Sequence, residues 1–307
     1  MHKRVAMART RRLQDILDEL SSYLVEGATA PSLDTVTARL SHRNSYVVSK
    51  AAAVAGRHAL EESVGPLRDA FGRMCSGGTK ADKGCLAKKA IVKALDRLGH
   101  DDTQWFIDAS RCVQAEPVYG GTVDTATDVR CGCIRAMTRF DWGRVCHALA
   151  RLTGDREPKV RMAAVDALCA FGNREAELIV LTRTMAGDSS EEVMGVCFRA
   201  LIAFDRETYL DLVAEHLMRG DDAVRVEAAF ALAESRAPEA FEILHGAWEE
   251  ESGTDMRRSL LLAIGMLRTP GAAALLAGHL NDSRFGEIAR ETLESYPAEL
   301  REGTRSG

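Results

Sequence analysis

The stretch VRMAAVDAL at residues 160–168 decides the fold. Its apolar and small side chains fall at positions i, i+3, i+4, i+7 and i+8, occupied by Val160, Ala163, Ala164, Ala167 and Leu168. This spacing places all of them on one face of an α-helix. We therefore predict a helix here that buries a face rich in alanine.

The same pattern recurs along the chain at intervals of 31 to 33 residues. Clear copies are VRCGCIRAM at 129–137, VMGVCFRAL at 193–201, VRVEAAFAL at 224–232 and MRRSLLLAI at 256–264; weaker ones begin near Val48, Ala87 and Phe285. A fixed period of this length is typical of stacked repeats. Together the copies indicate about eight units.

Each unit contains two helices. A second amphipathic stretch precedes each clear copy from 160–168 to 224–232, and a loop such as Gly154-Asp155 or Gly187-Asp188 separates the two. Glycine suits the end of one helix, and Asp or Ser caps the next. One such hairpin cannot bury its apolar face alone, so neighbours must stack. The sequence predicts an all-α protein, an α-solenoid (α/α superhelix) of about eight helical hairpins.

The pattern D-x-x-x-x-V-R-x-A-A-x-x-A-L, which runs from Asp155 to Leu168, resembles a HEAT repeat. The short period and the alanine-rich helix are similar to the HEAT-like repeats of the phycobilisome-lyase type. The resemblance is strong over 122–295 and loose over 30–110. It implies that the Val-Arg helices line a concave face and that recurring Asp and Arg form ladders. We expect the recurring arginines to be structural, namely Arg130, Arg161, Arg225 and Arg257.

Composition agrees with this architecture. The chain has 307 residues, which the usual ~100–200 residues per domain would divide into two domains, but repeat arrays do not follow that rule. Aromatic residues make up only 6%. We predict a capping helix over 1–29, a repeat solenoid over 30–300 with an irregular insertion near 100–128, and a disordered tail over 301–307.

The 8 cysteines and the chain's start favour a cytoplasmic protein. Several cysteines sit beside small apolar residues in helical patterns, where a free thiol behaves as a small apolar side chain. The basic start is not followed by the apolar run of a secretory signal, and no stretch approaches the ~18 apolar residues of a membrane helix. We expect no disulfides and no membrane partner.

The repeat is interrupted in two places. The first, CSGGTK at 75–80, lacks the spacing of a phosphate-binding loop, and we predict a flexible inter-repeat loop there. The second is the insertion at 100–128, where Pro117 and Gly120-Gly121 force a non-helical path. Aromatic, acidic and basic side chains gather in it, and we select as candidate ligand or peptide-binding residues Trp105, Asp108, Arg111, Glu116 and Tyr119. A structural insertion, with Asp124 or Thr125 capping the next helix, is the alternative.

A basic stripe is the second candidate feature. Residues 1–150 carry 22 Lys and Arg against 17 Asp and Glu, so this half is basic although the whole chain has a net charge of -5. Lysines of the helix near Ala87 and arginines of the next repeat helix fall on exposed i, i+4 positions. We add these to the binding residues: Lys89, Lys93, Arg135 and Arg139. Lys88 and Arg97 belong to the same expected stripe.

Residue types limit the chemistry. Cys131 and Cys133 diverge on a helix, so zinc is not expected, and the His-Glu pairs of HEAT-like hydroxylases are absent. We predict no catalytic residue, metal or cofactor. The first hypothesis is a scaffold that binds a protein or peptide partner on its concave face near 100–128. The alternatives are a HEAT-like enzyme or lyase/chaperone with a closed pocket around the insertion, or a glycosylase-like nucleic-acid-binding protein that uses the basic half.

Overall fold

The computed structural model describes residues 2–302, and its side chains from 12 to 301. Contacts divide it into two compact units, one up to Leu149 and one from Ala150. The predicted capping helix corresponds to a helix over His2–Ser22, and its capping role stays a prediction, as does the single solenoid domain over 30–300. Most of the expected tail at 301–307 lies outside the described residues.

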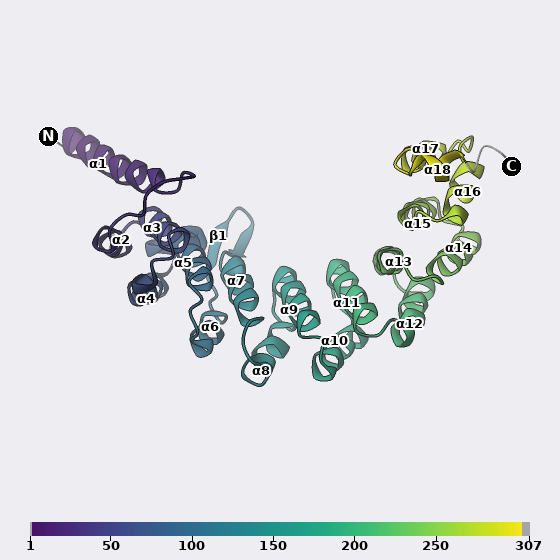
Figure 1. The fold of residues 1–307 in the computed structure, drawn as a ribbon, viewed down its shortest axis with the longest axis horizontal. Helices are drawn as coiled ribbons and strands as arrows, with labels where there is room; N and C mark the ends of the chain where they lie inside the picture. Colours follow the sequence, from purple (N-terminus) through teal and green to yellow (C-terminus); the bar gives the residue numbers. More distant parts are fainter. Residues whose placement is uncertain (1, 303–307) are drawn as a thin grey trace. The chain divides into compact units, whose positions relative to one another are not determined.

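The first unit contains helices and one β-hairpin (Figure 1). In chain order the elements are α1 (His2–Ser22), α2 (Leu33–Leu40), α3 (Ser45–Arg57), η1 (Glu61–Ser63), α4 (Val64–Ala81), η2 (Lys83–Cys85), α5 (Leu86–Arg97), α6 (Thr103–Ala109), β1 (Ala115–Val118), β2 (Gly121–Asp124), α7 (Thr127–Met137) and α8 (Trp142–Leu152), within which the division falls.

The second unit is helical throughout its described residues. Its elements are α9 (Pro158–Phe171), α10 (Arg174–Ala186), α11 (Glu191–Phe204), α12 (Arg206–Arg219), α13 (Asp222–Ser235), α14 (Ala240–Glu250), α15 (Thr254–Met266), α16 (Pro270–Gly278), α17 (Gly286–Glu294) and α18 (Ala298–Glu302).

The predicted repeat is confirmed. The eight sequence copies fall in α3, α5, α7, α9, α11, α13, α15 and α17, with Phe285 immediately before the last of these. In the first unit α3 packs on α5 and α5 on α7; in the second, α9, α11, α13, α15 and α17 pack in the same serial order. We call these the inner helices. In the first unit α2, α4 and α6 each pack against the inner helix that follows, and in the second unit α10, α12, α14 and α16 do the same, so each unit has two layers.

The face predicted from 160–168 is the buried one. Val160, Ala164 and Leu168 are wholly buried. Buried alanine lets helices approach closely: an added Cβ on Gly56 of α3 would lie 3.0 Å from the Cα of Ala94 on α5. Close packing between inner helices therefore explains why their buried faces are rich in alanine.

The recurring arginines are structural, as expected. Arg161 is 6% exposed, and its guanidinium donates to both carboxylate oxygens of Asp188 at 2.8 and 2.5 Å and to the carbonyl of Asp155 at 2.8 Å. Arg225 likewise bonds the Glu251 carboxylate at 2.5 Å and the Leu217 carbonyl at 2.9 Å. These bonds join neighbouring hairpins: Arg161 and Asp188 form an Asp–Arg step of the ladder that the resemblance implied, and Arg225 forms a similar step with a glutamate in place of the aspartate.

One local expectation needs correction, and a second gains detail. The segment 75–80 is not an open loop: it continues α4, with a break at Gly78, whose φ of 54° is in the left-handed region. The irregular path at 100–128 contains a short helix, α6, and an antiparallel hairpin in which Ala115 pairs with Asp124 and Val118 with Gly121. Gly120 occupies the tight turn with φ of 85°.

Candidate functional site

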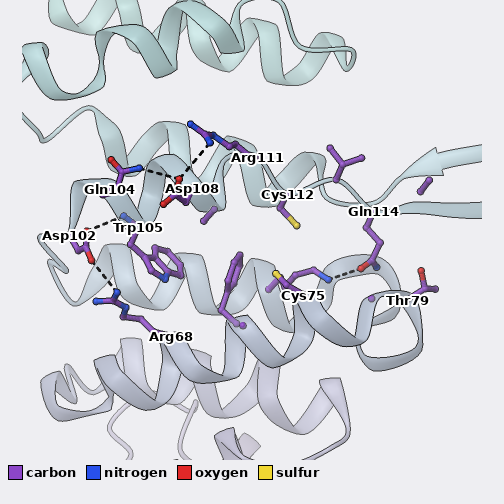
Figure 2. A pocket seen from close by; sticks show the side chains of 17 residues that line it. Arg68, Cys75, Thr79, Asp102, Gln104, Trp105, Asp108, Arg111, Cys112 and Gln114 are labelled. Atoms are coloured by element: carbon purple, nitrogen blue, oxygen red, sulfur yellow. Dashed lines mark hydrogen bonds and ion pairs between the residues drawn. The ribbon is translucent and has the colours of Figure 1, made fainter.

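A cavity of about 730 Å³ lies in the first unit, between α4, α6 and the segment that leads into β1 (Figure 2). Helix α4 contributes one wall, α6 and residues 111–115 the other, and Lys88 of α5 reaches it from the inner layer. Three of the sequence-predicted binding residues line it: Trp105, Asp108 and Arg111.

Local structure fixes the position of Trp105. Asp102 caps α6 and accepts a hydrogen bond from the Trp105 backbone N–H at 3.0 Å. The half-buried indole meets the ring of Phe71 on α4 at 5.0 Å between centroids and the ring of Phe106 at 5.1 Å, both edge to face. Such aromatic contacts hold the ring in one orientation. Trp105 is therefore a preorganised apolar wall of the cavity.

Charged groups lie at the same end of the cavity as Trp105. The Arg68 guanidinium lies 3.1 Å from the Asp102 carboxylate, and Arg111 lies 3.9 Å from Asp108, which also accepts a hydrogen bond from Gln104 at 3.1 Å. The Arg111–Asp108 pair is exposed and the Arg68–Asp102 pair has an exposed guanidinium on a half-buried carboxylate; pairs at the surface contribute only about 0–1 kcal/mol. Either guanidinium can therefore exchange its partner for a carboxylate of a ligand at low cost.

The other end of the cavity is set by a buried lysine. Lys88 is 1% exposed; its ammonium donates to the Gln114 Oε1 at 2.7 Å and lies 3.6 Å from the Asp82 carboxylate. Asp82, wholly buried, accepts hydrogen bonds from the backbone N–H groups of Ala87 and Lys88 and so holds the first turn of α5. Lys88 is thus not part of an exposed stripe, and that expectation was wrong.

Glu116 and Tyr119 do not line the cavity. Glu116 is 5% exposed and accepts hydrogen bonds from the Gly84 N–H at 2.6 Å, from Gln114 at 2.7 Å and from Thr125 at 2.9 Å. The bond from Gly84 is the largest cause that lowers the pKa of Glu116, so this carboxylate is ionised and anchors the hairpin. Tyr119, at the hairpin turn, is fully exposed. The single pocket around all five insertion residues does not form.

Asp124 has a structural role, as the alternative interpretation expected, but neither it nor Thr125 caps α7: the N-cap is Ala126, and no side chain caps that end. The Asp124 carboxylate accepts hydrogen bonds from the backbone N–H groups of Gln114 and Ala126, both at 2.9 Å. Arg130, 2% exposed, donates to Asp124 at 2.6 Å and to the Cys112 carbonyl at 2.8 Å. This buried set fixes the segment from Cys112 to Gln114 that forms one wall of the cavity.

Three of the four basic candidates lie on the inner helices α5 and α7, and Arg139 follows the end of α7. Lys89, Lys93 and Arg135 are exposed, and Lys89 pairs with Asp128 of α7 at 3.1 Å. Arg139 has a packing role: it donates to the His100 carbonyl at 2.5 Å, and its guanidinium lies 4.6 Å from the Phe140 ring centroid. The nine predicted binding residues therefore fall into a cavity set, an inner-helix set and three residues outside both.

The spacing of the repeat contains a signal that would have predicted the burial of Lys88. The spacing from Asp82 to Ala87 and Lys88 is the same as the spacing from Asp155 to Val160 and Arg161. Lys88 thus occupies the position of the buried ladder arginines, which carries it into the interior. The contributions of Arg68, Phe71 and Cys75 depend on how α4 packs near α6, and no local pattern signals that.

Comparison with known proteins identifies the family. The family model of HEAT repeats matches residues 122–202 and 210–296. The chain belongs to the HEAT-repeat family. A search of curated proteins gives no match.

Two solved structures are similar over most of the chain. The complex of CpcE and CpcF of phycocyanin lyase from Nostoc sp. PCC7120 matches at 16% identity and a TM-score of 0.41, covering 89% of this chain and 97% of that one. Human deoxyhypusine hydroxylase in complex with glycerol matches at 16% identity and a TM-score of 0.28, covering 98% and 99%.

Two structural findings bear on the expected chemistry. Among the side chains that the structure describes, no group of three or more His, Cys, Asp and Glu is placed to hold a metal ion. Over the same part of the chain, no helix combines the length and the apolar character that crossing a bilayer requires.

Proposed function

We propose that this HEAT-repeat protein binds a peptide segment of a protein partner in the cavity between α4 and α6. The observation that carries the proposal is the combination of a fixed, half-buried Trp105 with two exposed guanidiniums, Arg68 and Arg111, around one hollow of about 730 Å³. Ligand sites in proteins fall in the range of about 300–1,000 Å³. Trp and Arg are the residue types that dominate binding energy at protein interfaces.

The lining suggests what the segment looks like. Phe71 and Trp105 offer an apolar surface for one aliphatic or aromatic side chain. Arg68 and Arg111 offer guanidiniums to a carboxylate, which they bind in a planar, two-point arrangement. The wall formed by α6 and residues 111–115 is already ordered by the bonds of Asp102 and Arg130, so little entropy is lost there on binding. We expect a segment with an apolar residue next to an acidic one.

The exposed face of α5 and α7 is the alternative surface for the same function. It carries Lys89, Lys93 and Arg135, and the family resemblance predicts that the inner helices form a concave face. Part of its charge is offset, because Lys89 pairs with Asp128. We therefore propose this face as a secondary contact that a longer acidic partner would reach.

Selected peptides separate the two surfaces. A phage-displayed library of random peptides is panned on the immobilised full chain, and the Kd of an enriched peptide is measured by fluorescence anisotropy. Trp105→Ala should weaken binding by at least about 30-fold, the effect of losing a hot-spot residue worth about 2 kcal/mol. Tyr119→Ala, an aromatic truncation at the exposed hairpin turn, is the matched control and should leave the Kd unchanged.

A second variant tests the inner face. Triple reversal of Lys89, Lys93 and Arg135 to Glu should change the Kd of a short peptide by less than about threefold, because those side chains lie on a different surface. Circular dichroism checks that each variant keeps its helical content. Loss of binding in the triple variant, with Trp105→Ala binding as the wild type does, would refute the cavity and assign the partner to the inner face.

A further inference from the structure

Two thiols face one another inside the cavity. Figure 2 shows the sulfur of Cys75, on α4, pointing toward the sulfur of Cys112, on the segment after α6. Both residues line the cavity, and both are free thiols in the structure. Cys75 is exposed and Cys112 is half-buried, so a small reagent can reach the first directly and the second through the cavity.

The environments of the two thiols shift their pKa values in opposite directions, so that one ionises more readily than the other. The hydrogen bond between the two thiols lowers the pKa of Cys75, and the ammonium of buried Lys88 acts in the same direction. The same hydrogen bond raises the pKa of Cys112. Cys75 is therefore the thiol that ionises first, and thiolate is the nucleophilic form of cysteine. By contrast, burial raises the pKa of Cys133, which makes that thiol inert.

We propose that Cys75 and Cys112 are a redox-active dithiol, which a small disulfide oxidant converts into an intramolecular disulfide across the cavity. The inference is independent of what the cavity binds. It rests on two facing thiols from separate elements, an accessible cavity and a buried cation beside them.

The exchange balances without any other reactant. The Cys75 thiolate, having given its proton to solvent, attacks one sulfur of the oxidant RSSR; a Cys75–S–S–R bond forms and RS⁻ leaves. Cys112 then loses its proton and attacks the Cys75 sulfur, which forms the Cys75–Cys112 bond and releases the second RS⁻. Both thiolates take up the protons that were lost. Two electrons pass from the chain to the oxidant, which becomes two RSH.

The test uses the full chain and glutathione as the probe. The protein is equilibrated in buffers of increasing glutathione disulfide content, quenched with acid, alkylated and digested, and the fragments are identified by mass spectrometry. We expect a cross-linked fragment that joins Cys75 to Cys112, together with loss of two alkylated thiols and no other disulfide. Absence of that fragment in the most oxidising buffer would overturn the proposal.

Single variants define the order of the steps. In Cys112→Ser the attack of the second thiol is impossible, so glutathione should accumulate as a mixed disulfide on Cys75, approaching one adduct per chain. In Cys75→Ser neither the adduct nor the cross-link should form. Cys146→Ser, which removes a half-buried thiol of α8, is the matched control and should oxidise as the wild type does. An equal loss of oxidation in Cys146→Ser, or no adduct in Cys112→Ser, would contradict the assignment.

Discussion

Asp188→Asn removes the central carboxylate of one ladder step in the second unit. The Asp188 side chain is wholly buried and binds the Arg161 guanidinium through both oxygens. It also binds Arg183 and accepts a hydrogen bond from the Ser190 backbone N–H at 2.9 Å. Asparagine keeps the shape but not the charge, so it leaves Arg161, which is 6% exposed, without its counterion.

The expected loss of stability follows from the burial of the Arg161–Asp188 pair. Removing one partner of a buried pair typically costs about 3–5 kcal/mol, and for a unit of about this length each kcal/mol lowers Tm by about 2–4 °C, so we expect a fall of about 6–20 °C. The matched control is Glu215→Gln, the same chemical change in an exposed pair with Arg219 at 2.7 Å. An exposed i, i+4 pair contributes about 0.3–0.5 kcal/mol, so the control should lower Tm by less than about 2 °C.

The assay is thermal unfolding followed by far-ultraviolet circular dichroism at several pH values. Burial alone would raise the pKa of Asp188, but the bonds from Arg161 and Ser190 and the two guanidinium charges lower it overall. A carboxylate with a lowered folded-state pKa stabilises the fold above its unfolded value of about 3.9 and loses that effect as pH falls through the folded value. The difference in Tm between the wild type and Asp188→Asn should therefore become smaller at acid pH. Equal Tm values for Asp188→Asn and Glu215→Gln at neutral pH would refute the reasoning.

Packing and hairpin variants extend the test. Gly56→Leu must force α3 away from Ala94 of α5 and should lower the free energy of unfolding by about 1–3 kcal/mol. Gly246→Ala, with no atom within 4 Å of the new Cβ, should raise it by about 0.5–1 kcal/mol. Urea titration measures both free energies of unfolding, and a change of the same sign in the two variants would contradict the packing account. Glu116→Ala removes the shared acceptor of Gly84, Gln114 and Thr125 at the hairpin base and leaves the Gly84 N–H without that bond, so amide exchange in β1 and β2 should accelerate by about 5- to 150-fold, the equivalent of about 1–3 kcal/mol. Exchange at the wild-type rate would show that the hairpin does not depend on Glu116.

Most of the fold could be predicted because each repeat encodes its buried face locally. The face from Val160 to Leu168 is specified by side chains a few residues apart, and each of its copies has the same spacing. Helix type, hairpin length and the ladder arginines all follow from local spacing. The short hairpin at Gly120 was predicted only as an irregular path, because strand pairing joins residues such as Ala115 and Asp124 that share no helical spacing.

The candidate site was predicted only in part. Trp105, Asp108 and Arg111 belong to one segment, so their types and proximity were visible in the sequence. Phe71 and Cys75 come from a helix some thirty residues earlier, and their place in the cavity depends on how two helices pack. Glu116 was selected for its charge, yet its donor Gly84 is remote in sequence, and the bond between them holds the carboxylate in the interior. Charge alone does not show whether a carboxylate faces a ligand or the protein.

Hydrogen exchange of the full chain, with and without the selected peptide, tests the central claim most directly. Amides of α6 and of the adjoining end of α4 should exchange more slowly in the complex, because a segment held beside Trp105 suppresses the local opening of both helices. Those of α5 and α7 should change less. Protection confined to α5 and α7, with α4 and α6 exchanging as in the free protein, would contradict peptide binding in the cavity.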